Sequence, residues 1–129
     1  MADPMVPVSW GELLDKVAIL EIKRQRLRAP GALANTEREL LALAPALAAL
    51  SPAPLGLAEL RSALAAVNQR LWTIEDRIRE KEAQGDFGED FVALARSVYR
   101  ENDERGRIKR AINTLLGSGL MEEKQYATY

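Results

Sequence analysis

The sequence of 129 residues contains no cysteine and no histidine. Their absence excludes disulfides, zinc sites with cysteine or histidine ligands, thiol nucleophiles, histidine general bases and histidine-ligated di-iron centres. No apolar run approaches the length of a membrane span, and eight glycines and six prolines are too few for a low-complexity chain. We therefore expect no metal and no cofactor.

The sequence also has no excess of either charge, because it contains 18 basic and 19 acidic residues. A net charge of -1 gives no overall field that would attract nucleic acid or anionic lipid. Residues 1–8 have neither the basic segment nor the apolar segment of a signal peptide. These features favour a cytoplasmic protein that binds neither nucleic acid nor a membrane.

The composition, 47% apolar and 29% charged, is typical of a folded globular protein. The length fits one domain, so we expect a single helical domain over residues 1–129. Residues 1–8 are expected to be a flexible N-terminus. Residues 118–129 are expected to be a C-terminal tail whose apolar side chains can dock against the helices.

Apolar residues recur at steps of three and four from Trp10 onward and predict a helix from Trp10 to Arg28, ending before Pro30. Ser9 and Glu12 form a capping box at its start. A second capping box, Thr36-Glu37-Arg38-Glu39, predicts that the next helix begins there. Pro45 lacks a backbone N–H, so we expect this helix to kink or restart at that residue.

The clearest pattern follows the prolines of residues 51–54 and consists of seven aliphatic residues spaced three, four, three, four, three and four apart: Leu57, Leu60, Leu64, Val67, Leu71, Ile74 and Ile78. It predicts a helix from Leu57 to Gln84 with Gly85 as a left-handed cap. A further helix is predicted from Glu89 to Leu116. Because the connecting loop is short, the two helices must be antiparallel. The sequence predicts an all-α antiparallel bundle of three long helices plus one short helix broken by proline.

Charged residues interrupt the apolar stripes of the first and last helices. Inside a protein such groups must pair, extend to solvent or line a cavity. The favoured interpretation is a boundary position with solvated charges, because these residues are almost never fully buried. The alternative is a polar ligand pocket between the first, third and fourth predicted helices. Its candidate residues are Glu21, Arg24, Asn68, Glu75, Asn102, Arg105 and Lys109.

Two basic runs, residues 23–28 and 105–110, each contain four cations in six residues. Such runs can bind phosphate, carboxylate or an acidic partner surface. The favoured interpretation is simpler: the first run complements the helix dipole, and the second pairs with acidic residues one turn back. Paired carboxylates such as Glu101 and Glu104 match only half of the Mg²⁺ motif of helical pyrophosphohydrolases.

Several segments together resemble a family of small bacterial helical proteins that is catalogued only as a domain of unknown function. They include residues 13–16, 19–23, 71–79, 87–88, 95–99, 108–110 and 122–124. The resemblance implies a helical fold and no established activity or ligand. It marks these polar members: Asp15, Lys16, Glu21, Lys23, Glu75, Asp76, Arg79, Arg96, Asn102, Asp103, Lys109, Arg110 and Asn113.

The functional interpretation that we favour is a soluble, non-catalytic binding or interaction module that associates with a protein partner or with itself through the predicted helices 57–84 and 89–116. The alternative is a small helical enzyme or anion-binding protein. Its polar cluster would receive a carboxylated, phosphorylated or nucleotide-sugar ligand. Arginine and lysine side chains that clamp a dicarboxylate need neither histidine nor cysteine, so the composition permits both classes.

Overall fold

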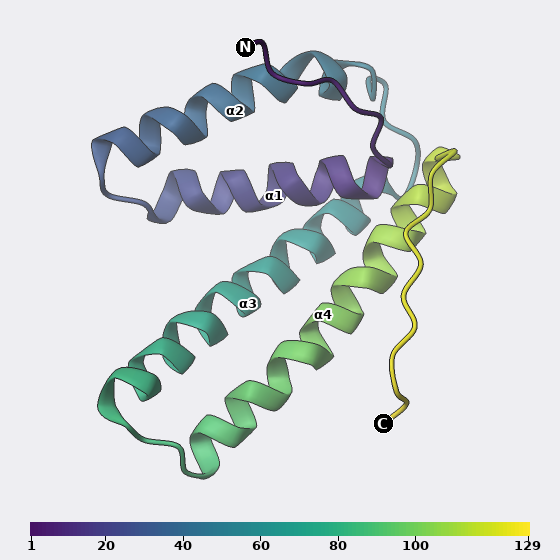
Figure 1. Cartoon of the computed structure of the whole chain (residues 1–129). Helices are drawn as coiled ribbons and strands as arrows, with labels where there is room; N and C mark the ends of the chain where they lie inside the picture. The colour runs from purple at the N-terminus through teal and green to yellow at the C-terminus, as the bar shows by residue number, and fades with distance from the viewer.

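The computed structural model describes all 129 residues and contains four α-helices and no strand. The helices are α1 (Trp10–Arg26), α2 (Pro30–Ala48), α3 (Leu57–Gln84) and α4 (Glu89–Leu116). Figure 1 shows two antiparallel hairpins, α1–α2 and α3–α4, that meet at one end and diverge toward the other. This confirms the all-α fold. No helix combines the length and the apolar character that a membrane crossing requires.

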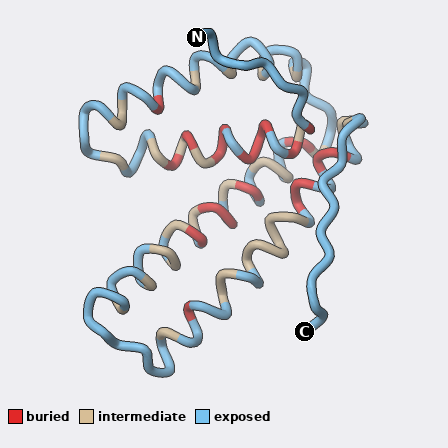
Figure 2. Tube along the Cα trace, in the orientation of Figure 1, coloured by how far each residue is buried: buried red, intermediate tan, exposed pale blue.

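Helix α1 is the central element, because it packs against each of the other three helices. The core lies where α1 crosses the first half of α3 and the last half of α4, as the buried positions in Figure 2 show. Its buried members are Leu14, Ala18, Leu57, Leu64, Val67, Ile108 and Ile112. The far part of the α3–α4 hairpin is covered by neither α1 nor α2 (Figure 1).

The predicted bounds of α3 and α4 are confirmed. Gly85 and Gly117 end these helices with φ values of 66° and 65°, in the left-handed region that glycine adopts without a steric penalty. The predicted cap of α1 also forms, because the backbone N–H of Glu12 donates to Ser9 Oγ at 3.1 Å. The Glu12 carboxylate, however, turns toward α4 and binds Lys109.

The predicted start of the second helix was wrong. Helix α1 ends at Arg26 rather than Arg28, and α2 begins at Pro30 rather than Thr36. Proline suits the first turn of a helix because its φ is already helical and its missing N–H has no partner there. It also keeps the preceding residue out of the helical region, and Ala29 accordingly has a ψ of 125°.

The expected break at Pro45 was wrong as well. Thr36 caps nothing and donates its hydroxyl to the carbonyl of Ala32, and α2 continues through Pro45 to Ala48. Leu41 and Pro45 are both exposed, so water can hydrate the Leu41 carbonyl that proline leaves without a helical donor. At 19 residues, α2 is longer than the 17 residues of α1. It is therefore not the short, broken helix that the sequence predicts.

Candidate functional site

The amino end of α1 abuts the side of α4 closely. A Cβ atom on Gly11 would lie 2.5 Å from the carbonyl oxygen of Lys109, so only glycine fits at this crossing. The free N–H groups of the first turn are satisfied by side chains from the far end of the chain. Trp10 N–H donates to Ser118 Oγ at 2.9 Å, and Gly11 N–H donates to Asn113 Oδ1 at 2.6 Å. These contacts fix α1 against α4.

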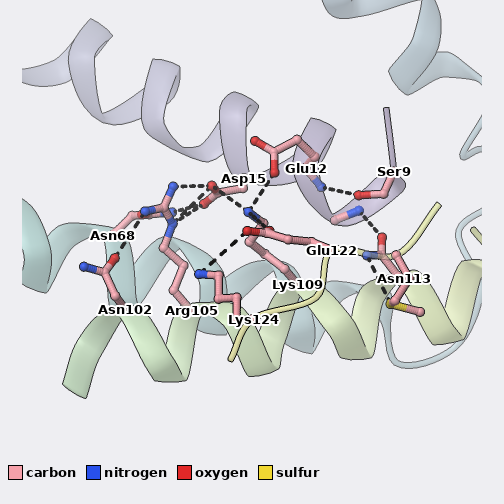
Figure 3. Close-up of polar contacts among 12 residues, drawn as sticks. Ser9, Glu12, Asp15, Asn68, Asn102, Arg105, Lys109, Asn113, Glu122 and Lys124 are labelled. Atoms are coloured by element: carbon pink, nitrogen blue, oxygen red, sulfur yellow. Dashed lines mark hydrogen bonds and ion pairs between the residues drawn. The ribbon is translucent and has the colours of Figure 1, made fainter. Parts of the chain in front are cut away.

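One turn further along α1, the carboxylate of Asp15 is buried with 1% of the residue exposed. It accepts hydrogen bonds from Asn68 Nδ2 at 2.9 Å and from Arg105 Nε at 3.0 Å, and a further one from Arg105 Nη2 (Figure 3). The hydrogen bond to Asp15 raises the pKa of Arg105. A single carboxylate therefore joins α1, α3 and α4 through charge-assisted hydrogen bonds.

Lys109 provides the second cation of this region, and its side chain is only 10% exposed. Its ammonium donates to Glu12 at 2.8 Å and to Glu122 of the C-terminal tail at 3.1 Å. Burial acts against the charged form, but the hydrogen bonds to Glu12 and Glu122 outweigh it and raise the pKa of Lys109. The same contact with Lys109 lowers the pKa of Glu122.

We call these five residues, Glu12, Asp15, Arg105, Lys109 and Glu122, the ionic cluster. Three carboxylates face two cations in it, so the cluster has no surplus positive charge to attract an anion. No buried side-chain oxygen or nitrogen lacks a hydrogen-bond partner, and no three acidic side chains converge closely enough to hold a metal ion. The ion pairs of the cluster hold α1 and the C-terminal tail against α4.

An open groove of about 500 Å³ lies beside the cluster, between α1 and α3. Its apolar lining includes Ile19, Leu71 and Trp72, and its polar lining includes Glu75, Asp76 and Arg79. The guanidinium of Arg26 lies 5.9 Å from the centre of the Trp72 ring. The volume is within the range of ligand sites, although Arg79 is already paired with Glu75.

Residues 5–129 match the model of a family described as "Family of unknown function (DUF6165)". The chain belongs to DUF6165. This match confirms the resemblance to an uncharacterised family of helical proteins. No curated protein and no solved structure matches the chain.

In this DUF6165 chain, four of the seven predicted site residues lie together and the other three are dispersed. Asn68 and Arg105 bind Asp15, and Asn102 Oδ1 accepts from Arg105 Nη1 at 3.4 Å. Lys109 belongs to the ionic cluster. The structure therefore brings four of the predicted residues together: Asn68, Asn102, Arg105 and Lys109.

The other three predicted residues are not part of the ionic cluster and do not lie together. Glu75 lines the groove together with Asn68 and Arg105. Glu21 borders a different small cavity, next to Arg61. Arg24 is exposed and lies 3.9 Å from Glu37 of α2, so it belongs to the α1–α2 hairpin. The predicted pocket of all these side chains does not form as one unit.

The spacing analysis missed the residues that complete the site, namely Glu12, Asp15, Asn113 and Glu122. Asp15 and Asn113 were singled out only by the family resemblance, as two of its polar residues. The sequence of α1 does carry a usable signal, because apolar residues at positions 13, 14, 17 and 18 flank Asp15, and all five residues are buried. A helix with apolar residues this densely spaced is covered on more than one side, so a charge among them must be paired in the interior.

Proposed function

We propose that this protein is a non-catalytic interaction module that pairs with a second copy of itself through the distal hairpin, defined as residues 71–98 of α3, α4 and their loop. The observation that carries the proposal is that the apolar seam between α3 and α4 continues past the last residue of α1, where no further helix packs on it. Arg26, at the end of α1, reaches only as far as Gln69 and Trp72.

Burial along α3 supports this proposal. Leu64 and Val67, beneath α1, have 1% and 0% of their surface exposed. Further along the same seam, Ile74 and Ile78 are only half-buried, although their spacing is unchanged. The seam therefore extends beyond the part of α3 that α1 covers, which supports a further covering element.

The α4 side and the connecting loop add exposed apolar surface. Phe91 and Val98 are half-buried, while Phe87 and Val92 have 55% and 51% of their surface exposed. The rings of Phe87 and Phe91 pack edge to face with centroids 5.2 Å apart. Large apolar side chains gathered at one end of a hairpin favour a protein partner.

A second copy fits this surface in shape. Two antiparallel helices that meet an identical pair across a two-fold axis complete a four-helix bundle. Acids outnumber cations in the distal hairpin, so the apolar contact has to outweigh a net repulsion between two copies: the acids are Glu75, Asp76, Glu80, Glu82, Asp86, Glu89 and Asp90, and the cations are Arg77, Arg79, Lys81 and Arg96.

The ionic cluster supports a non-catalytic role. A general base or nucleophile needs a free functional group directed at a substrate, whereas Asp15 and Lys109 are each engaged by two or more internal partners. The groups that could perform chemistry are thus occupied in holding the helices together.

The experiment is a mass measurement by light scattering across the micromolar concentration range. The wild-type protein is expected to have twice the chain mass of 14.3 kDa, and Ile78→Asp is expected to have the mass of one chain with unchanged helical circular dichroism. Leu41→Asp, on the exposed face of α2, is the matched control and retains the mass of two chains. If Ile78→Asp unfolds, Val92→Asp at the surface takes its place.

A wild-type mass of one chain throughout this range would overturn the proposal. So would a mass of two chains for both Ile78→Asp and Val92→Asp, because the interface would then lie elsewhere.

A further inference from the structure

The C-terminal tail, residues 118–129, has no helix and runs alongside α4 (Figure 1). Polar contacts hold it there. Glu122 binds Lys109 at 3.1 Å, Glu123 binds Arg110 at 3.3 Å, and the Tyr129 hydroxyl donates to Asp103. All residues from 119 to 129 are exposed, and the Tyr129 ring packs edge to face on Tyr99 of α4 with centroids 5.1 Å apart. The Glu123–Arg110 pair is exposed and therefore weak, whereas Glu122 binds an ammonium that is only 10% exposed. The tail is thus held by few contacts, and a stronger ligand of the same cations can displace it.

Beneath the tail lies the second basic run of the sequence. Arg107, Lys109 and Arg110 border a cavity of about 270 Å³ between α4 and the tail, and Lys124 closes it from the tail side. We call the three α4 cations, Arg107, Lys109 and Arg110, the basic face.

The tail carboxylates compensate part of the charge of the basic face, while Arg107 is paired with Glu104 of α4 itself. Glu123 is the only carboxylate paired with Arg110. Lys109 would retain Glu12 if the tail left, but it would lose Glu122. The two carboxylates occupy the positions that the oxygens of a bound anion would take, 3.1 Å and 3.3 Å from the cationic nitrogens.

We propose that the basic face is a binding site for a small phosphorylated anion, and that Glu122 and Glu123 occupy it as an internal competitor until that anion displaces them. Arginine and lysine side chains that converge on one region of α4 suit an ion with several phosphate oxygens. This site is separate from the distal hairpin, so it does not depend on self-association.

The test uses the full-length chain and pyrophosphate, titrated by calorimetry at low ionic strength. Wild-type protein is expected to bind weakly and Glu122→Gln/Glu123→Gln about tenfold more tightly, because a tethered competitor has been removed. Glu80→Gln/Glu82→Gln on α3 is the matched control: it changes the net charge equally but leaves the affinity close to that of the wild type. Adding Arg110→Gln to the tail variant is expected to abolish the gain.

A second measurement follows the tail directly. On addition of pyrophosphate to the wild-type protein, the amide NMR signals of residues 120–129 are expected to move to the positions of an unstructured peptide. Three results would each overturn the proposal: no saturable binding by either protein, an equal gain in the α3 control, or tail signals that stay in place at saturation.

Discussion

Asp15 in α1 and Arg105 in α4 form a two-pronged ion pair across the centre of the molecule, 90 positions apart in the chain. The aspartate is almost fully buried and the arginine side chain is 27% exposed. Because two guanidinium nitrogens engage one carboxylate, the pair fixes both the distance and the rotation of α1 relative to α4. Asn68 adds α3 to the same carboxylate.

We expect removal of the Arg105 side chain to destabilise the protein, because the Asp15 carboxylate is buried. Arg105→Ala leaves the Asp15 carboxylate in the interior with Asn68, and with Lys109 3.8 Å away. We expect the free energy of unfolding to fall by about 3–5 kcal/mol, the usual cost of orphaning one member of a buried pair. Urea denaturation monitored by circular dichroism measures it.

The double variant Asp15→Ala/Arg105→Ala is the control for this prediction. It removes both charges, so we expect a loss much smaller than the sum of the two single losses. Additive losses would contradict the assignment of a coupled pair. A loss below about 1 kcal/mol for Arg105→Ala would show that the arginine acts as a solvated surface group.

Gly11→Ala is expected to loosen the crossing of α1 and α4. The added methyl group would meet the Lys109 carbonyl at 2.5 Å and Asn113 Oδ1 at 2.9 Å. One of these contacts is backbone and cannot turn away, so we expect a loss of about 1–3 kcal/mol, as for other overpacked positions. Gly31→Ala, with nothing within 4 Å of the new methyl group, is the matched control. Equal thermal midpoints for the two variants would refute the close contact.

The sequence was sufficient for α3 and α4 and insufficient for α2, for a physical reason. Seven evenly spaced aliphatic residues and a terminal glycine are local signals, and nothing in the fold opposed them. Whether Pro45 breaks a helix depends on whether water reaches the Leu41 carbonyl, and the exposure of both residues is decided by how α2 lies on α1. The effect of a proline in a helix is therefore a tertiary property.

The candidate site was predictable in its cations and in Asn68 and Asn102, and not in its carboxylates. Arg105 and Lys109 stand out because they interrupt an apolar stripe. Their partner Asp15 lies in another helix, and the pairing follows from the angle at which α1 crosses α4. No periodicity in a single helix records that angle. Arg24 shows the opposite error, since it occupies a comparable stripe position but lies on the side of α1 that faces Glu37 of α2.

Two aliphatic residues of the same seam are expected to respond differently to truncation. Leu64 is 1% exposed in the core, so Leu64→Ala should cost about 3–4 kcal/mol through lost burial and the cavity left behind. Ile74 is half-buried in the distal hairpin, so at dilute, monomeric concentrations Ile74→Ala should cost only about 1–2 kcal/mol. Chemical denaturation of both variants at one low concentration compares them. Equal losses would show that the distal hairpin is covered within a single chain.

Stability is expected to decline at alkaline pH through Lys109. Its pKa is raised above the ordinary value of 10.5, because the hydrogen bonds to Glu12 and Glu122 outweigh the desolvation that lowers it. Once the pH exceeds 10.5, the unfolded chain loses this proton first, while the folded chain still holds it. The folded state then binds more protons than the unfolded state, so the free energy of unfolding decreases as the pH rises.

The measurement is the urea midpoint from neutral pH to above pH 10.5 for the wild type and for Lys109→Met, which keeps an unbranched side chain of similar length. The pKa values of Lys81 and Tyr129 are also raised, but both groups are present in the two proteins, so the difference between the curves isolates Lys109. The wild-type curve should fall more steeply. Parallel curves would mean that the ammonium is held no more strongly in the folded chain than in the unfolded one, and the ionic cluster would then contribute geometry without pH-dependent stability.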